Sequence, residues 1–267
     1  MSDETTFALQ FLKDIRARRV EVRRNTELWK SIDRDLASNP PQVREGPRSI
    51  EGLAEFSWPL AHWNHGQRLQ DFWVAYELGA KRNGYFVEFG AANGTNMSNT
   101  VMLERRFGWT GILSEPNLGF HNEIRRSRKC RFTPKAVHDA TGTKLEFVCA
   151  SRPMLSRLAV SEDARNEDFI AEEIVQVETI TLNDLLDEFA APSIIDYISI
   201  DTEGTEYQIL SAFDFGARHV RALSIEHNYG DRREQIHALM TANGYVRRFE
   251  YLSGFDDWYL HRDDVAD

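Results

Sequence analysis

Polar groups follow four apolar runs of the chain, each of a length typical of a buried strand. The glycine turn at Gly90 follows the first run, and Glu115, Asp201 and Glu226 follow the later ones. In an open parallel sheet the carboxyl ends of the strands form one rim, and the ligand crevice lies beyond it. We therefore expect these groups to face one site. Carboxylates there can accept hydrogen bonds from hydroxyls, hold a cation or take up a proton.

The turn "GAANG" begins at Gly90 and suggests which ligand the site holds. A dinucleotide fingerprint, G-x-G-x-x-G, needs a second glycine two positions after the first, where this chain has Ala92. The turn therefore fits a nucleoside without a pyrophosphate, such as S-adenosylmethionine. Glycine would let the backbone approach that ligand closely, and Glu115 would accept both ribose hydroxyls. Glu88 and Asp201 could receive the ammonium group of the methionine part, or Glu88 could instead fix the turn.

A reaction at a substrate hydroxyl on this rim would require alignment and a way to remove the hydroxyl proton. His227 is the natural general base, because histidine titrates near neutral pH and this one follows a strand. Asp201 and Glu226 are the other candidate catalytic groups. The alternative is a divalent cation such as Mg²⁺ held by Asp201, Glu226 and Asn228, which are all oxygen ligands. We favour the base, and a purely structural role for His227 is a further alternative. Glu203, at a predicted helix start, either caps that helix or acts in the site.

Composition narrows the class of protein. The chain has 267 residues, which suits one large α/β domain with an appendage. Its 32 basic and 42 acidic side chains give a formal charge of -10, so nucleic acid and membrane surfaces are not expected partners. Cys130 and Cys149 are too few for a disulfide framework or a zinc cluster. No window has eighteen apolar residues and the N-terminus lacks a signal-peptide pattern, so we expect a soluble cytoplasmic protein.

Apolar runs alternate with helical patterns from Tyr85 onward. Such alternation predicts a parallel sheet covered by helices on both faces. The two final extended runs, "YVRRFEYL" and "DWYLHR", are joined by "SGFD" and predict a hairpin that closes the sheet with an antiparallel strand. The polar segment 151–172 is interpreted as an insertion over the rim. The expected strands are 85–89, 110–114, 131–137, 195–200, 220–225 and "TKLEFVCA", with helices after Asn96, Asn117, Thr181, Glu203 and Asp231.

The N-terminal segment favours helix from Thr6 to about Leu36. It carries one narrow apolar stripe with a spacing of seven residues, which predicts a helix that packs on the domain or on a second subunit. A homo-oligomer formed through this helix is therefore a hypothesis. The stripe consists of Ile15, Val22, Trp29 and Leu36.

The segment "SNPPQVREGPRS" is interpreted as a linker because of its three prolines and glycine. We divide the chain into an N-terminal helical extension with linker, residues 1–66, and a domain, residues 67–267. The aromatic stretch "FSWPLAHWNHG" is more consistent with sealing a helix onto the core than with stacking on a sugar.

Five motifs, in order, resemble those of the FkbM family of S-adenosylmethionine-dependent methyltransferases: "FVEFGAANGTNMSNT", "GILSEPN", "KAVHDATG", "YISIDTEGTEYQIL" and "LSIEHN". The resemblance covers about Gln67 to Tyr259. It implies an α/β fold with a seven-stranded, Rossmann-like class I methyltransferase sheet, mostly parallel with a closing antiparallel hairpin. By matching position it implies a set of cofactor-lining residues: Glu88, Gly90, Ala91, Asn93, Gly94, Glu115, Pro116, Val137, His138 and Asp201.

The resemblance also implies O-methylation of a hydroxyl on a sugar, glycan or natural product, so the expected partner is a small-molecule or glycan acceptor. One departure is Ala92, where relatives usually have asparagine and this chain has Asn93 one position later. Two other function classes stay open. A nucleotide-cofactor oxidoreductase is disfavoured by the missing second glycine, and a catalytically silent binding protein of the same fold would keep the sheet without the reaction.

Overall fold

The fold is built around one central sheet, shown in a computed structural model that describes residues 3–38, 40–43, 46–161 and 169–266. The sheet has the strand order β10-β11-β9-β8-β1-β2-β3, with β11 antiparallel to both of its neighbours and the other pairs parallel. The predicted α/β class with a mostly parallel sheet is confirmed. The strands are β1 (Tyr85–Phe89), β2 (Thr110–Ser114), β3 (Arg131–Thr133), β8 (Ile194–Ile200), β9 (His219–Glu226), β10 (Tyr245–Arg248) and β11 (Asp256–His261).

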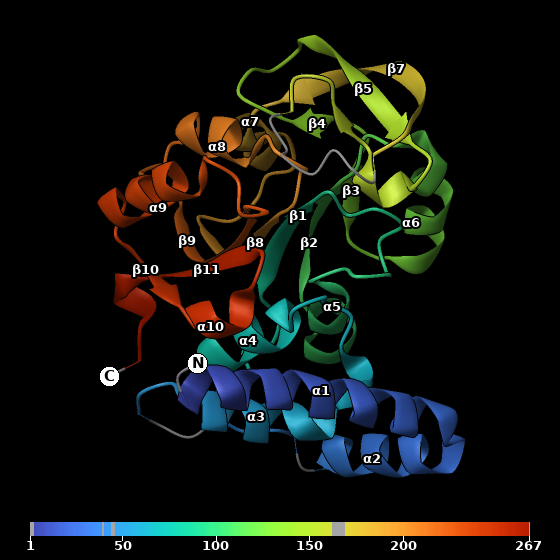
Figure 1. Cartoon of the computed structure of the whole chain (residues 1–267), viewed down its shortest axis with the longest axis vertical. Coiled ribbons are helices and arrows are strands. Elements are labelled where there is room, and N and C mark those ends of the chain that lie inside the picture. The colour runs from blue at the N-terminus through green and yellow to red at the C-terminus, as the bar shows by residue number, and fades with distance from the viewer. Residues whose placement is uncertain (1–2, 39, 44–45, 162–168, 267) are drawn as a thin grey trace.

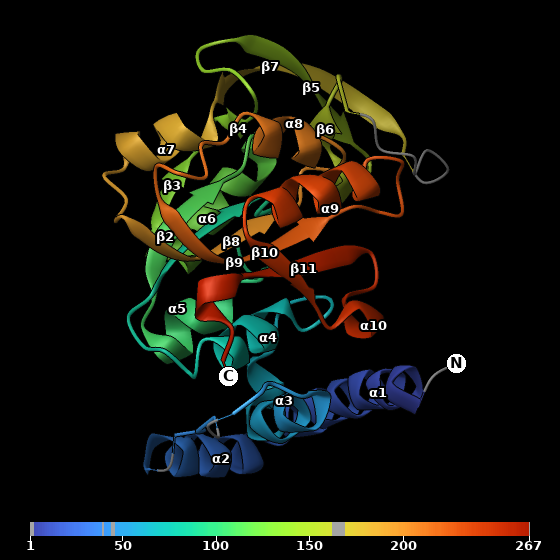
Figure 2. The same cartoon turned by 90° about the vertical axis from the view of Figure 1, so that its left-hand side faces the viewer.

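The central strands are buried on both faces, as their nearly continuous apolar sequences require. Four of the five residues of β1 are buried, and so are six of the seven residues of β8. One face packs against α4 (Gln70–Glu77), α5 (Val101–Phe107) and α6 (His121–Ser127), and the other against α7 (Leu182–Glu188), α8 (Glu206–Ser211) and α9 (Arg233–Ala242). Figure 2 shows these two layers.

A second sheet, in the order β4-β7-β5-β6, lies beyond the carboxyl ends of β1 and β2 (Figure 1). It corrects the single strand expected over 131–137, because Pro134 separates β3 from β4 (Ala136–Val137) and a proline cannot donate a ladder hydrogen bond. The long strand β7 (Ala171–Ile180) was not predicted. It pairs with β5 (Lys144–Ala150), the strand expected at "TKLEFVCA", and β5 pairs with β6 (Arg157–Leu158).

The expected insertion at 151–172 contributes η3 (Pro153–Leu155), β6 and the first residues of β7 to this second sheet. Its residues 162–168 lie outside the described part of the chain. The interpretation of this segment as a cover over the rim is therefore met in part, since Leu158 of β6 lies in the pocket described below.

The N-terminal segment forms two helices rather than the single one expected. Asn25 ends α1 (Asp3–Arg24), and its side chain accepts a hydrogen bond from the backbone N–H of Leu28 at 3.0 Å, which caps α2 (Thr26–Ser38). The predicted stripe is buried inside this chain at Ile15, Val22 and Leu36. An interface with a second copy would have to use other residues, so the homo-oligomer stays a prediction.

The extension and the domain share one hydrophobic core. Ala8, Phe11 and Ile15 of α1 belong to the same buried cluster as Trp73 of α4 and Trp258 of β11. Three further elements complete the packing: α3 (Ile50–Ser57), the 3₁₀ helix η1 (Trp58–Trp63) and α10 (Glu250–Ser253), which contacts α1. The boundary proposed at residue 66 therefore divides the sequence but not the core.

The aromatic stretch packs on the N-terminal helices α1 and α2. Asp33 of α2 accepts hydrogen bonds from the indole N–H of Trp29 at 2.7 Å and of Trp63 at 3.0 Å, and His62 Nε2 lies 3.1 Å from the same carboxylate. Trp58 is 47% exposed, with the Arg18 guanidinium 5.7 Å from its ring centre. The sealing role is the one that the structure supports.

The closing hairpin is shorter than expected. Phe249 has a left-handed backbone (φ 48°) that ends β10, and residues 250–253 form α10 instead of extending the strand. Short 3₁₀ turns occur at η2 (Leu118–Phe120) and η4 (Arg262–Asp264). Within the described residues, no helix combines the length and apolarity that spanning a membrane requires.

Candidate functional site

The predicted rim forms where β1, β2, β8 and β9 end. Strained backbone gathers there: of the ten described non-glycine residues with positive φ, five lie in the loops after β1, β8 and β9, namely Ala92, Met97, Glu203, Asn228 and Tyr229. Such conformations cost free energy and persist where the surrounding structure holds them, which is common in functional sites.

Glu88 fixes the turn after β1. Its carboxylate accepts hydrogen bonds from Ser98 Oγ at 2.9 Å, the backbone N–H of Asn99 at 2.8 Å and Thr100 Oγ1 at 2.5 Å. The side chain is almost fully buried. Of the two roles considered for Glu88, the structure therefore supports fixing the turn, because its oxygens are already used by the chain.

Arg128, which sequence reasoning missed, closes the other side of this turn. From the end of α6 its guanidinium donates to the Gly94 carbonyl at 2.9 Å, to Ser98 Oγ at 3.2 Å and to Thr100 Oγ1 at 2.9 Å. It also pairs with Glu104 of α5. Only its place in the fold distinguishes Arg128 from the other basic residues of "RRSRK", so the sequence carried no signal for it.

Gly90 is required by a contact within the protein. A Cβ at this position would lie 1.7 Å from the carbonyl oxygen of Asp201, and its φ of 68° also favours glycine. The close approach of a ligand to this glycine stays a prediction, since Gly90 also lines the pocket described below. The turn after β1 packs directly on the loop after β8.

Glu115 connects the turn after β1 to the end of β2. One carboxylate oxygen accepts from the Ala92 N–H at 2.8 Å and the other from the Asn117 N–H at 2.8 Å. The pKa of Glu115 is raised to about 7, mainly by burial and to a smaller extent by the negative charge of Asp201, against the two hydrogen bonds, which lower it. A carboxylate has about four lone-pair sites, so Glu115 can accept two further donors.

A narrow pocket opens beside Glu115, between the rim and the second sheet. Apolar side chains from both sheets form its walls. Its volume is about 40 Å³, well below the roughly 300 to 1,000 Å³ of typical small-molecule sites. The pocket is lined by Phe89, Gly90, Ser114, Glu115, Pro116, Ala136, Val137, Phe147, Leu158, Thr202 and Thr205.

Three carboxylates gather at the rim where β8 and β9 end. Each of Asp201, Glu203 and Glu226 offers an oxygen within 4.8 Å of the others. Burial raises the pKa of Glu226 well above its ordinary value, and the charges of Asp201 and Glu203 raise it further. Asp256, opposite Glu226 on β11, has a pKa raised to about 7 by burial and by the charge of Asp201, and Gln70 donates to it at 2.5 Å.

His227 faces away from this acid group. Successive residues of a strand point to opposite faces; Glu226 lies beside Asp256, whereas the Nε2 of His227 lies 3.7 Å from Asp257. The Nδ1 of His227 accepts the backbone N–H of Tyr229 at 2.9 Å, so in the neutral ring the proton is on Nε2. The unprotonated nitrogen is already engaged, which argues against the expected role of His227 as general base.

The comparison with known protein families agrees with this arrangement. The family model of the Methyltransferase FkbM domain matches residues 88–249, which contain the last two residues of β1, the whole of β2, β8 and β9, and the rim at their carboxyl ends. The chain belongs to the FkbM methyltransferase family. No curated protein matches the sequence.

The FkbM match confirms the resemblance seen in the sequence and identifies a methyltransferase domain. It begins at Glu88 and ends at Phe249, so the N-terminal helices and β11 lie outside the matched range. Asp256 and Gln70, which complete the acid group from outside the match, are features of this chain's own packing.

Four of the expected cofactor residues line the pocket of the FkbM domain: Gly90, Glu115, Pro116 and Val137. The others do not. Ala91 is buried, Asn93 Oδ1 accepts the backbone N–H of Thr95 and Asn96, and His138 Nδ1 lies 2.6 Å from Asp139 beside a different hollow. Glu88 and Gly94 support the turn from behind, and Asp201 adjoins the pocket through Thr202.

The expected cation ligands come together in part. Asp201 and Glu226 are close, but the third carboxylate near them is Glu203. Asn228 lies with His227 and Tyr229 along a separate hollow between α8 and α9. A cation bound by the FkbM domain at this rim would therefore meet three carboxylates rather than two and an amide.

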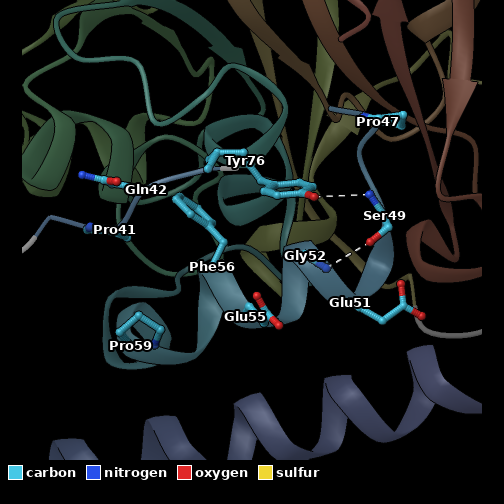
Figure 3. Close-up of a pocket in the computed structure, with 11 residues that line it drawn as sticks. Pro41, Gln42, Pro47, Ser49, Glu51, Gly52, Glu55, Phe56, Pro59 and Tyr76 are labelled. Carbon is cyan, nitrogen blue, oxygen red and sulfur yellow. Dashed lines mark hydrogen bonds between the residues drawn. The ribbon is translucent and has the colours of Figure 1, made fainter. Parts of the chain in front are cut away.

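A larger hollow lies away from the FkbM rim, beside α3. It has a volume of about 460 Å³, and Glu51, Glu55, Phe56 and Tyr76 are among the residues around it. Figure 3 shows the Tyr76 hydroxyl accepting the backbone N–H of Ser49 at 3.2 Å. It contains none of the predicted site residues and lies outside the matched range, so size alone does not identify the functional site.

Proposed function

We propose that the chain is an S-adenosylmethionine-dependent O-methyltransferase whose acceptor is a hydroxyl of a sugar, glycan or natural product. The observation that carries the proposal is Glu115, a buried acid at the end of β2 that holds the turn after β1 and still has acceptor sites to offer. Two hydroxyls on adjacent carbons of a ribose match those remaining sites.

The residues around the pocket have the chemistry needed to bind this cofactor. Val137, Phe147 and Leu158 supply apolar walls for a purine, and Glu115 supplies the hydroxyl acceptor. The acid group of Asp201, Glu203 and Glu226 supplies negative charge beside the pocket. The bound cofactor would supply a methyl group on a positively charged sulfur. The positive charge of that sulfur, placed beside the three carboxylates, would relieve the repulsion among them.

The small volume of the pocket adds a requirement. An adenine ring cannot enter about 40 Å³, so the two walls must separate when the cofactor binds. Phe147 of β5 and Leu158 of β6 belong to the second sheet, whereas Gly90 and Glu115 belong to the rim of the central sheet. We infer that the second sheet moves relative to the rim, while the turn fixed by Glu88 and Arg128 keeps its shape.

For the acceptor proton we propose Glu226, with Asp201 beside it. A carboxylate with a raised pKa is a stronger base than an ordinary one, and burial together with the charges of Asp201 and Glu203 raises the pKa of Glu226. Asp201 contributes by raising this pKa. His227 would position the loop after β9 through its hydrogen bond from Tyr229.

A divalent cation is the second account of the same residues. Asp201, Glu203 and Glu226 are oxygen ligands of the kind that Mg²⁺ takes, and a cation would lower the pKa of the acceptor hydroxyl. The two accounts differ in one measurement. With Glu226 as base, transfer survives exhaustive chelation, whereas the cation account requires activity lost on chelation and restored by magnesium.

The two other function classes, an oxidoreductase and a silent binding protein, differ from a methyltransferase in which cofactor they bind or in whether they transfer a methyl group. A nucleotide-cofactor oxidoreductase needs a pyrophosphate cradle, and the position of its second glycine is Ala92 with a left-handed backbone (φ 44°). A silent binding protein would bind cofactor without transfer. Isothermal titration with S-adenosylhomocysteine and with NAD separates the first class, and a panel of hydroxylated acceptors with methyl-labelled S-adenosylmethionine separates the second.

The proposal requires saturable binding of S-adenosylhomocysteine, no binding of NAD, and label transferred to a hydroxyl acceptor. Binding of NAD alone would overturn it. Label transferred only to amines would keep the methyltransferase and replace the acceptor class. A cytoplasmic location, the lack of nucleic-acid and membrane partners, and a homo-oligomer through the N-terminal helix stay predictions.

A further inference from the structure

A second group of side chains that could bind a metal lies at the opposite end of the central strands from the rim. His219 opens β9, His261 ends β11, and Asp264 ends η4. Each offers a nitrogen or oxygen atom within 4.8 Å of the atoms offered by the other two. Because β9 and β11 are antiparallel neighbours, the start of one strand lies beside the end of the other. This places the group at the opposite end of β9 from Glu226.

The three side chains already face one another. His219 Nε2 lies 2.7 Å from Asp264 Oδ2, and the two imidazole rings have centres 4.7 Å apart with planes at 80°. Two rings in edge-to-face contact beside one carboxylate can direct two nitrogens and one oxygen toward a common point. The side chains of His219, His261 and Asp264 are 35%, 21% and 12% exposed, so the group is within reach of solvent.

Neighbouring groups orient these side chains. The other oxygen of Asp264, Oδ1, lies 3.5 Å from Arg221 Nε, which leaves Oδ2 directed at His219. The Nδ1 of His261 accepts the backbone N–H of Asp263 at 3.3 Å, so in the neutral ring the proton is on Nε2. To bind an ion through Nε2, the ring must move this proton to Nδ1, where the Asp263 carboxylate, 3.7 Å away, can hold it and orient the ring.

Gly244 leaves space at the remaining nitrogen of His261. It has a left-handed backbone (φ 87°), and a Cβ added there would lie 3.1 Å from His261 Nε2. A side chain at this position would crowd the nitrogen, whereas glycine leaves the approach open. Within the described residues, the site is thus built from β9, β11, η4 and the turn before β10.

We propose that His219, His261 and Asp264 bind a zinc ion. Two imidazoles and one carboxylate form a ligand set that zinc accepts, with water in the fourth position. Magnesium and calcium prefer oxygen ligands and belong instead at sites such as the acid group at the rim. The ion would connect the first residue of β9 with the last residue of β11 and with η4, which fixes the C-terminal turn to the sheet.

The test uses the full chain without a histidine tag at pH 7.5, where imidazoles are mostly neutral. Zinc chloride is added in a calorimeter, and cobalt(II) is used as an absorbing probe of the ligands. We expect one ion per chain and weakening of at least about tenfold in His261→Gln. His237→Gln is the matched control, because His237 contacts Tyr259 outside this group, and it should bind as the parent does.

Each other outcome overturns the proposal. No saturable binding would mean that His219 and Asp264 form only the hydrogen bond seen here. Binding unchanged in His261→Gln would place the ion elsewhere, and a cobalt–thiolate absorption band would assign it to Cys130 or Cys149. Loss of binding in Glu226→Gln, with His261→Gln unaffected, would assign it to the rim.

A second expected result is that zinc raises the melting temperature of the parent but not that of His261→Gln.

Discussion

The carboxylate of Glu115 accepts a hydrogen bond from the backbone N–H of Ala92 at 2.8 Å, so an acid at the end of β2 holds the turn after β1. The same carboxylate reaches the Asn117 N–H on its own loop. Two motifs that lie more than twenty residues apart in the sequence are therefore one unit in the structure, and the predictions below start from that unit.

Glu115→Ala should weaken the binding of S-adenosylhomocysteine by roughly 1.5 to 3 kcal/mol, because the ribose hydroxyls lose a charged acceptor. Isothermal titration measures the change. Glu146→Ala is the control, since Glu146 is exposed on β5 and its side chain lies outside the pocket. Unchanged affinity in a folded Glu115→Ala variant would remove Glu115 from the binding site.

The affinity for S-adenosylhomocysteine should rise with pH through about 7. The raised pKa of Glu115, about 7, means that the free protein holds this carboxyl protonated below that pH. Hydroxyl donors favour the ionised form, so binding at lower pH must first release a proton, at a cost of up to about tenfold in affinity per pH unit. Glu115→Gln should flatten this dependence. A slope that persists in Glu115→Gln would assign the proton to another group, such as Asp256.

Arg128→Met should lower the stability by about 3 to 5 kcal/mol, because the buried carboxylates of Glu88 and Glu104 would lose their positively charged partner. Urea unfolding followed by circular dichroism measures this. Cofactor affinity should fall as well in the folded fraction, since the carbonyl of Gly94 and the hydroxyls of Ser98 and Thr100 lose their donor.

Arg126→Met is the matched control for Arg128, because Arg126 is exposed on the same helix. It should leave both stability and affinity close to those of the parent. If Arg128→Met loses stability but binds S-adenosylhomocysteine normally, Arg128 has no part in shaping the turn for the cofactor.

Glu226→Gln should lower turnover by about a hundredfold or more with nearly unchanged S-adenosylhomocysteine affinity, because an amide cannot accept the acceptor proton. His227→Ala should stay within a few-fold of the parent in turnover, since its unprotonated nitrogen is engaged by Tyr229. Methyl transfer to an acceptor found in the panel, measured from pH 6 to 9, provides both numbers. The reverse pattern would return the role of base to His227.

A shortened chain that begins at Ser49 should be strongly destabilised. Loss of the N-terminal helices should therefore do more than reduce the number of subunits in an oligomer. The deletion uncovers Leu53, Phe56 and Leu60, which share a core with Phe11, Leu12 and Ile15 of α1. Each buried side chain lost contributes about 1.5 to 3 kcal/mol. Thermal unfolding of the shortened and full chains measures the loss, and light scattering on the full chain tests the homo-oligomer separately. A shortened chain with unchanged melting temperature would show that α1 and α2 are dispensable for the fold.

The sequence predicted the parallel strands and the rim because both follow from local patterns. Uninterrupted apolar runs located β1, β2, β8 and β9, and the polar residues after them located the site. The orientation of His227 could not be predicted in this way, because β9 ends at Glu226 and His227 belongs to the loop that follows. The alternating residues Val175, Val177 and Thr179 were a signal for β7 that went unused.

The remaining features depend on contacts that no local pattern contains. Arg128 acts on the turn from the end of α6, and Phe147 with Leu158 reaches the pocket from a second sheet. The reason for Gly90 lies in the Asp201 carbonyl, more than a hundred residues away in the chain. Each required the tertiary arrangement before a role could be assigned.

The contact between α1 and α10 has a consequence for how the molecule is made. Helix α1 leaves the ribosome well before its partner α10, which begins only at Glu250. At about 5 to 20 residues per second, the apolar face of α1 waits on the order of tens of seconds for that partner. The helices α2 and α3 and the turn η1, which also contact α1, follow it closely in the chain, so during this interval only the part of α1 that packs on α10 lacks its partner.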